Sequence, residues 1–257
     1  MLSAVIITFN EEKNIATCLN SLLTVADEIV VVDSFSTDKT REICESFPKV
    51  RFLTHPFNGH IEQKNFALQQ ARFDYILSLD ADEALSDEAI RSVLEVKKNF
   101  TADAYTFSRL TSYCGKWIRH GGWYPDRKLR MAMKNKVIWQ GINPHDELCL
   151  LEKGTIVHLK GDILHYSVKS IDDHLNTIYK FSRIAAEHRF QKGIKSGWFK
   201  ILVHPLWKFV KIFFIRAGFL DGYYGFLIAR LSAFSTFLRY IRLRELWKQK
   251  IDHERNH

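Results

Sequence analysis

The chain has 257 residues, of which 46% are hydrophobic, so it can form one large domain or a domain with an appendage. Its four cysteines show neither Cys-x-x-Cys pairing nor a zinc-like histidine spacing, which argues against a disulfide framework and indicates reduced cytosolic thiols. The net charge of +8 is uneven: residues 1–100 carry 10 Lys/Arg and 16 Asp/Glu, whereas residues 101–257 carry 27 and 13. This asymmetry predicts an anionic partner for the second part, either nucleic acid or an anionic membrane surface. The first residues lack a basic n-region, so no signal peptide is expected.

Short apolar runs alternate with amphipathic segments over the first hundred residues. The apolar runs predict strands at residues 4–8, 28–33, 50–54, 75–79 and 104–107. Between them, helical spacing and capping residues predict helices that start near residues 15 and 36 and cover 61–71 and 86–98. Because these strands are too short and too apolar to be half exposed, we expect a parallel sheet covered by helices on both faces, an α/β fold.

Polar residues follow three of these strands: Asn10-Glu11, Asp33-Ser34 and Asp80-Ala81-Asp82. Ligands bind at the carboxyl ends of parallel strands, so these groups are expected to face one crevice. On an extended chain the side chains of Asp80 and Asp82 leave the same side, and paired carboxylates suit Mg²⁺ or Mn²⁺. The alternative is a solvated acidic turn that caps a helix.

Glycine motifs that hold dinucleotides or phosphates are absent from the sequence. No Gly-x-Gly-x-x-Gly follows the first strand, and no Walker loop occurs anywhere. This argues against a dinucleotide oxidoreductase or a P-loop kinase, and favours a nucleotide held through carboxylates and a metal.

Four motifs resemble those of family 2 glycosyltransferases of the GT-A fold, and they span about the first 110 residues: 5–12, 31–40, 63–68 and 79–83. Three later stretches, 121–126, 144–147 and 218–222, resemble the branch that contains lipopolysaccharide core β-1,4-glucosyltransferases. The resemblance implies inverting transfer of a sugar, with UDP-glucose as the expected donor, to a hydroxyl of a lipid-anchored saccharide such as the lipopolysaccharide or lipooligosaccharide inner core. It also implies a peripheral location on the cytoplasmic face of the bacterial inner membrane.

The resemblance also implies roles for individual residues of the donor site. Glu11 would contact the ribose, and Asp33 would accept a hydrogen bond from the base. Asp80 would lie near the ribose, and Asp82 would bind the metal that bridges the diphosphate. Lys64 would face the nucleotide or its phosphates, unless it is simply an exposed helix residue. Further donor-binding candidates are Asn10 and Arg130.

Residues 111–130 are rich in glycine and aromatic residues and interrupt the strand–helix alternation. We expect a loop that lines the site, in which Trp123 or Tyr124 stacks on a sugar ring. Arg127 or Arg130 is expected to meet an anionic acceptor or the leaving diphosphate. The alternative is a hydrophobic plug with a solvated basic flank.

The acceptor hydroxyl needs a carboxylate base, and Asp146 or Glu147 supplies the candidates. Asp126 is less suitable, because the adjacent Arg127 is expected to hold it as an ion pair. We prefer Asp146, whose shorter side chain is held more rigidly, although the stretch can also be a polar turn. His165 is either a further metal ligand or a hydrogen-bonded interior residue.

From residue 170 the chain is expected to be helical. Residues 189–250 contain 13 Lys/Arg, two acids and 15 aromatics, and the longest uncharged runs have eight residues. Such runs are far shorter than the ~20 residues of a membrane span. Basic residues interleaved with aromatics suit a membrane interface, the alternative being a helical subdomain with a basic outer face. We therefore divide the chain into a GT-A domain, residues 1–167, and a basic helical extension, residues 168–257.

Two other functions remain open. The same fold can glycosylate polyprenyl phosphate, an acceptor that needs no strong base. A basic nucleic-acid-binding protein is the second alternative, but the acidic crevice would repel a polyanion, and the basic segment is aromatic at helical spacing. No nucleic-acid partner is therefore expected.

Overall fold

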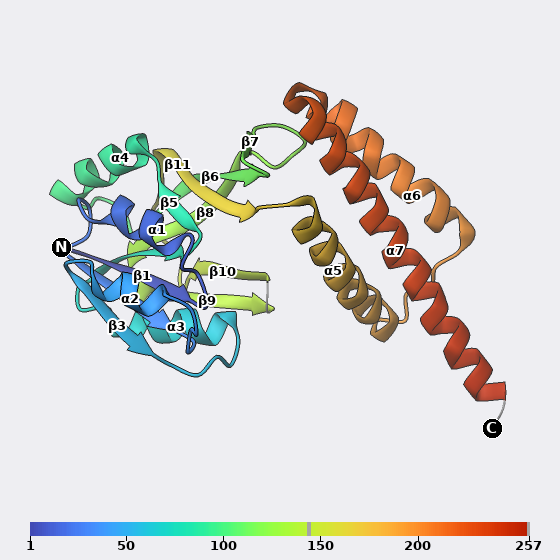
Figure 1. Cartoon of the computed structure of the whole chain (residues 1–257), viewed down its shortest axis with the longest axis horizontal. Coiled ribbons are helices and arrows are strands. Elements are labelled where there is room, and N and C mark those ends of the chain that lie inside the picture. Colours follow the sequence, from blue (N-terminus) through green and yellow to red (C-terminus); the bar gives the residue numbers. More distant parts are fainter. Residues whose placement is uncertain (143–144, 256–257) are drawn as a thin grey trace. The chain divides into compact units, whose positions relative to one another are not determined.

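The computed structural model describes residues 1–142 and 145–255 (Figure 1). The chain forms two compact units: a sheet unit of residues 1–110 and 125–166, and a helical unit of residues 111–124 and 167–257. The predicted division at residue 167 assigned all of 111–124 to the sheet domain, whereas this segment packs with the helices.

The expected alternation of strands and helices is present in the first hundred residues. The elements are β1 (Leu2–Thr8), α1 (Ile15–Leu22), β2 (Glu28–Asp33), α2 (Thr40–Glu45), β3 (Val50–Thr54), α3 (His60–Gln70), β4 (Tyr75–Asp80), β5 (Glu83–Leu85) and α4 (Asp87–Lys98). Strands then predominate: β6 (Ala104–Tyr113), β7 (Lys116–Ile118), β8 (Asp126–Met133), β9 (Val137–Ile142), β10 (His145–Leu150) and β11 (Ile156–Val168).

The main sheet has the order β3-β2-β1-β4-β8-β6-β11-β5, with β7 paired to β6. The predicted α/β class is confirmed, and the parallel part consists of β3, β2, β1 and β4. Beyond β4 the sheet is mixed, because β8 runs antiparallel to both β4 and β6. The register pairs Thr8 with Asp33 and Ile7 with Asp80, so the polar ends of three strands meet at one edge.

Hydrophobic residues cover both faces of the parallel strands, which explains their continuous apolar runs. Ala4 and Ile6 of β1 pack in the cluster that includes residues of α1, α2 and α4. Val5, between them, packs in the opposite cluster with α3, β9 and β10. Since successive side chains of a strand point to opposite faces, a strand covered on both sides has no polar face.

Two helix starts follow the capping chemistry expected from the sequence, and one does not. The hydroxyl oxygens of Ser86 and Ser170 accept hydrogen bonds from the backbone N–H groups of Ala89 and Asp173. Helix α2 begins at Thr40, later than expected, because Asp38 accepts from the backbone N–H groups of Thr40 and Glu12 and so ties the loop after β1 to this turn.

The segment expected to be a single loop over residues 111–130 contains regular structure. It includes β7, which pairs with β6, and the first half of β8, which pairs with β6 and so carries Arg127 and Arg130 in the sheet. Alternating basic and apolar residues in β8 are a strand pattern that the glycines and aromatics before it obscured.

The helical unit contains α5 (Ile171–Gln191), α6 (Trp198–Val210), a π-helical segment (Lys211–Ile215), a 3₁₀ turn (Gly218–Asp221) and α7 (Gly222–Arg255). Helix α7 packs against both α5 and α6 (Figure 1). In the described part of the chain, no single helix has the length and hydropathy of a membrane span. The helices over 198–215 and 218–254, bent by 72°, meet these criteria only as a pair and only by length and composition.

Candidate active site

A cavity of about 630 Å³ opens at the carboxyl ends of β1, β2 and β4. Its volume is in the range of small-molecule sites. Thirteen residues, all from the sheet unit, line it: Ile7, Thr8, Phe9, Glu11, Ser34, Phe57, His60, Lys64, Asp80, Ala81, Asp82, Asp146 and His165. The structure thus brings together Glu11, Lys64, Asp80, Asp82, Asp146 and His165, six of the residues that the sequence singled out.

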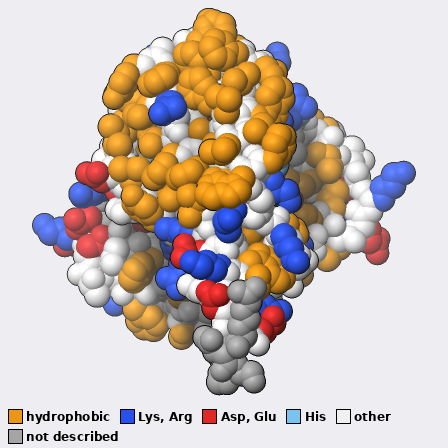
Figure 2. All heavy atoms as spheres, turned by 90° about the vertical axis from the view of Figure 1, so that its right-hand side faces the viewer, with side chains coloured by type: hydrophobic (Ala, Val, Ile, Leu, Met, Phe, Trp, Pro, Cys, Tyr) orange, Lys and Arg blue, Asp and Glu red, His pale blue; other side chains and the backbone are white. Residues whose placement is uncertain are grey.

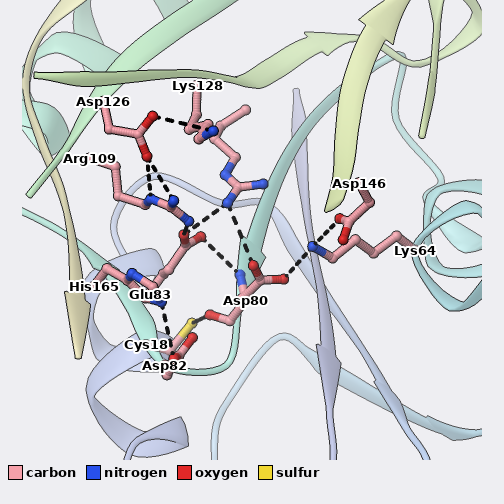
Figure 3. Close-up of polar contacts among 11 residues, drawn as sticks. Cys18, Lys64, Asp80, Asp82, Glu83, Arg109, Asp126, Lys128, Asp146 and His165 are labelled. Atoms are coloured by element: carbon pink, nitrogen blue, oxygen red, sulfur yellow. Dashed lines mark hydrogen bonds and ion pairs between the residues drawn. The ribbon is translucent and has the colours of Figure 1, made fainter. Parts of the chain in front are cut away.

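Charged side chains of alternating sign cross the floor of this site (Figure 3). The Lys64 ammonium lies 2.8 Å from a carboxylate oxygen of Asp80 and 2.8 Å from one of Asp146. Arg130 Nη2 lies 3.5 Å from the other Asp80 oxygen and 2.8 Å from Glu83 Oε1. Both Asp80 oxygens therefore face cations.

The chain of charges continues away from the cavity. Arg109 lies 3.5 Å from Glu83 and 2.7 Å from Asp126, and Lys128 lies 3.3 Å from Asp126. The second oxygen of Glu83 accepts a hydrogen bond from the backbone N–H of Asp80, which fixes the turn between β4 and β5.

Burial explains why these charges must be paired. Lys64, Glu83 and Arg130 have at most 6% of their surface exposed. Burial alone would raise the pKa of Asp80, but the charges of Lys64 and Arg130 outweigh it and hold that pKa well below its usual range. Burial alone would lower the pKa of Arg130, but the charges of Glu83 and Asp80 outweigh burial and raise this pKa above its usual value. Asp80 and Arg130 therefore stay charged at neutral pH.

Trp139 of β9 supports both cations. Its ring centroid lies 4.3 Å from the Lys64 ammonium and 5.3 Å from the Arg130 guanidinium carbon, which are cation–π distances. Asn65 of α3 holds β9 in place, since its amide donates to the Trp139 carbonyl and accepts from the Trp139 N–H. Helix α3 thus positions Lys64 and its aromatic neighbour together.

Asp80 and Asp82 line the same cavity but meet different partners. The chain leaves β4 at Asp80, and Ala81 and Asp82 lie in a turn, so the extended geometry expected for the pair does not apply. Asp82 faces His165, whose Nε2 lies 3.3 Å from a carboxylate oxygen. Pairing of β11 with β5 aligns His165 with Glu83 and so brings it to this turn.

Asp82 and His165 fit a divalent cation better than Asp80 does. Ligand atoms at about 2.1 Å from an octahedral cation lie roughly 3 Å apart, close to the observed separation. Among the described residues, no group of three or more His, Cys, Asp or Glu is arranged to hold a metal. The remaining ligands would have to come from a bound diphosphate and water, which is how Mg²⁺ is commonly held.

The structure distinguishes the two candidate bases. Asp146 faces Lys64 and lines the cavity, and its side chain is only 9% exposed. Glu147, the next residue of β10, is exposed and does not line this cavity. Both residues line a second cavity of about 340 Å³, together with Arg109, Arg127, Lys128 and Arg130. Residues 143 and 144 of this motif lie outside the described residues.

The ends of β1 and β2 are joined by hydrogen bonds. Asp33 is 2% exposed, and its carboxylate accepts from the backbone N–H and the hydroxyl of Ser36. Asn10 has a positive φ of 53° and accepts from the Thr37 N–H. Ser34 rather than Asp33 lines the cavity, so the contact between Asp33 and the base remains a prediction.

The expected acceptor residues are separated between the two units. Trp123 and Tyr124 belong to the helical unit, where Trp123 packs against Tyr113 and the Arg119 guanidinium lies 5.5 Å from the Tyr124 ring. Arg127 is an exposed residue of β8. The expected pairing of Asp126 with Arg127 is wrong, because neighbouring residues of a strand point to opposite faces and Asp126 instead meets Arg109 and Lys128.

Several residues of the site were not identified from the sequence. Glu83, Arg109 and Trp139 form the support of the site, and Phe57 and His60 line the cavity. One available signal was Arg109 itself, a charged residue in an otherwise uncharged strand, which implies a buried partner.

Similarity to known proteins covers most of the chain. A sequence profile described as "Glycosyl transferase family 2" matches residues 3–149. An uncharacterized glycosyltransferase of Rickettsia typhi is 34% identical over 95% of this chain and 87% of its own length. The lipopolysaccharide core biosynthesis glycosyltransferase LpsC of Rhizobium meliloti is 28% identical over 92% of this chain and 89% of its own. Among solved structures, S. aureus TarS 1–349 in complex with UDP aligns with 97% of this chain and 91% of its own, with 17% identity and a TM-score of 0.49.

The Lys64 bridge leads to a test of stability. Lys64→Met leaves Asp146 without its observed cation, and removal of one partner of a buried ion pair costs about 3 kcal/mol or more of unfolding free energy. The control is Lys98→Met, because Lys98 pairs with Glu95 on the surface and both side chains are more than 70% exposed. That control is expected to cost less than about 1 kcal/mol. Urea unfolding followed by circular dichroism measures both, and equal small losses would contradict a stabilising role for the bridge.

Proposed function

The chain belongs to glycosyl transferase family 2, and we propose that it transfers a sugar, with glucose as the expected one, from a UDP-sugar to a hydroxyl of a lipid-anchored saccharide. The observation that carries this proposal is the cavity in which Asp80, Asp82, Lys64 and Asp146 meet. It provides carboxylates for the donor side, a cation for phosphate and a separate carboxylate for the acceptor.

The proposed reaction inverts the anomeric carbon in one displacement. Asp146 accepts the proton of the acceptor hydroxyl while the oxygen attacks the sugar, and the diphosphate leaves with the electrons of the broken bond. The Asp146 side chain is half of an ion pair with Lys64, and this pairing fixes its orientation. No covalent sugar–enzyme intermediate is required.

Lys64 connects donor binding to the base in this mechanism. A bound diphosphate carries more negative charge than Asp80 or Asp146 and competes with them for the ammonium. When Lys64 shifts toward the diphosphate, the Asp146 carboxylate is released from its ion pair and can accept a hydrogen bond from the acceptor hydroxyl. The acceptor carboxylate is therefore activated only when a donor is present.

We further propose that the reaction depends on Mg²⁺ or Mn²⁺. Asp82 and His165 would hold the ion, and a divalent cation at that position neutralises the charge that develops on the departing diphosphate. Glu11, which lines the same cavity after the end of β1, and the adjacent Asn10 are candidates for nucleoside binding.

The acceptor proposal rests on the second cavity and on the relatives. Five cations and three carboxylates line this cavity: Lys64, Arg109, Arg127, Lys128 and Arg130, with Asp80, Asp146 and Glu147. Such a lining suits a saccharide that carries phosphate or carboxylate groups. LpsC, a lipopolysaccharide core biosynthesis glycosyltransferase, is similar over nearly the whole chain. A lipopolysaccharide or lipooligosaccharide inner core is therefore the proposed acceptor.

We also propose that the protein works as a peripheral protein on the cytoplasmic face of the inner membrane. Helix α6 supports this, because Trp198, Phe199, Leu202 and Leu206 are each at least 64% exposed. An apolar helix face flanked by basic residues suits insertion at a lipid headgroup boundary.

Comparison of the glycans from cells with and without the gene, by mass spectrometry, tests the overall function: loss of one hexose from the core is expected, and an unchanged core would contradict it.

Replacement of the proposed base is the sharpest test of the mechanism. Asp146→Asn is expected to lower kcat by about 10²–10⁴, because the proton acceptor is lost, and to retain UDP-sugar affinity, because Lys64, Asp80 and Asp82 remain. The matched control is the neighbouring Glu147→Gln, which is expected to remain active. Turnover assays with calorimetric donor binding check both variants, and if Glu147→Gln carries the loss instead, Glu147 is the base.

Metal dependence is tested through nucleotide binding. Calorimetry is expected to show UDP binding that requires Mg²⁺ or Mn²⁺ and that is lost in EDTA and in Asp82→Ala, because Asp82 would help to hold the ion that compensates the charge of the diphosphate. Asp87→Asn, which removes an exposed carboxylate five residues away, is expected to retain metal-dependent binding. Equal UDP affinity with and without EDTA would remove the ion from the proposal.

Membrane attachment is tested with exposed leucines of α6. Leu202→Gln/Leu206→Gln removes two side chains that are 64% and 65% exposed, so the fold is expected to persist while vesicle binding falls about tenfold or more. The control is Leu151→Gln/Ile156→Gln in the sheet unit, where the side chains are 57% and 51% exposed. Flotation with anionic vesicles measures binding, and an equal loss in both double variants would exclude α6 as the contact.

A further inference from the structure

The helical unit contains a cavity of its own. It has a volume of about 510 Å³ and is lined by residues of α5, α6 and α7 and by Lys211. His204 and Lys208 of α6 lie four residues apart on one helix face, and Lys211, the first residue of the π-helical segment, extends this row. Helix α7 contributes Ser232, Ser235, Thr236 and Arg239, which recur at helical spacing on the opposite wall.

The charge of this cavity is of one sign. Three cations, Lys208, Lys211 and Arg239, line it, and among the described residues no Asp or Glu does. The Arg239 Nε is buried and has no hydrogen-bond partner among the described residues. Three like charges around one space repel each other, and hydroxyl groups do not compensate them.

The pKa directions agree with an uncompensated cationic site. The surrounding protein removes the Lys208 ammonium partly from water, which lowers its pKa, and repulsion from Arg216 and Lys211 lowers this pKa further. Burial and the charge of Arg189 lower the pKa of Arg239. An anion in the cavity would reverse both effects, because it stabilises the protonated forms.

The cavity borders the exposed apolar face of α6. Trp207 lines the cavity and is 56% exposed, and the exposed residues Val203 and Leu206 lie within one turn of it on the same helix. Figure 2 shows a broad area of hydrophobic side chains with Lys and Arg side chains around and within it. Lys208 and Lys211 are themselves exposed, so the cations can be reached from outside.

We propose that this cavity binds the phosphate monoester headgroup of a membrane lipid while the lipid's acyl chains lie along the apolar face of α6. A phosphate monoester carries close to two negative charges and has three free oxygens, which match three cations and the hydroxyls of Ser232 and Ser235. The lipid is favoured over a free phosphate because the cavity adjoins exposed apolar side chains, which a free ion would leave in water. The site lies outside the cavity of the sugar-transfer reaction, and its assignment does not depend on that reaction.

Vesicle binding by the full-length protein tests this site. Vesicles with phosphatidic acid are compared with phosphatidylglycerol vesicles matched for surface charge. Lys208→Gln/Lys211→Gln changes two exposed residues, so it is expected to fold as the unchanged protein does, which circular dichroism checks. The control, Lys180→Gln/Lys192→Gln, removes the same charge from exposed positions of the same unit outside the cavity.

We expect the unchanged protein to prefer phosphatidic acid, and the Lys208/Lys211 variant to lose about tenfold more affinity for those vesicles than the control variant does. On phosphatidylglycerol vesicles the two variants are expected to lose affinity equally, through general electrostatics alone. Equal losses on phosphatidic acid would overturn the proposal. So would calorimetric binding of inorganic phosphate that depends on Lys208 and Lys211 in a protein without preference for phosphatidic acid, since that result assigns the cavity to a free ion.

Discussion

The pairing of Asp80 with Lys64 and Arg130 is the interaction on which the site depends. An aspartate at the end of a buried strand is costly unless cations face it, and here each carboxylate oxygen has one. The two cations come from α3 and β8, and their other partners come from β10 and β5. One carboxylate thus links its own strand, β4, to α3, β5, β8 and β10, and none of its neighbours can move without leaving a buried charge uncompensated.

This arrangement also limits how the site can respond to a ligand. Lys64 is shared between Asp80 and Asp146, the proposed donor-side and acceptor-side carboxylates, at equal distances of 2.8 Å. In the described residues, Asp80 has ion pairs with two cations, Lys64 and Arg130, and Asp146 has one with Lys64. In the proposed mechanism, an added anion that draws Lys64 away would therefore leave Asp80 paired with Arg130 and release Asp146 from its ion pair.

Local patterns predicted the fold well and the site only in part. The apolar runs gave β1 to β4 closely because burial on both faces removes polar residues from the whole strand. Asp80 and Asp82 were found because polar residues at strand ends converge in such sheets, whereas Lys64 was named from the family resemblance and Asp146 from the need for an acceptor-side base. Their ion-pair partners were not found, since which cation meets which carboxylate depends on the register of β8 and β10, which no local pattern encodes. The strand β8 was missed because the glycines and aromatic residues before it obscured its strand pattern.

The distribution of charge gives the two units different physical characters. The sheet unit carries 18 Lys/Arg against 22 Asp/Glu, and the helical unit 19 against 7. In the sheet unit, most buried charges lie beside a charge of opposite sign, as the series of ion pairs between Lys128 at one end and Asp146 at the other shows. In the helical unit, no Asp or Glu of the described residues lines the cavity with its cations, and α6 exposes large apolar side chains. Clustered cations without acids and exposed apolar side chains are both unfavourable on a surface that faces only water. An anionic membrane surface would neutralise the cations and would cover the apolar side chains.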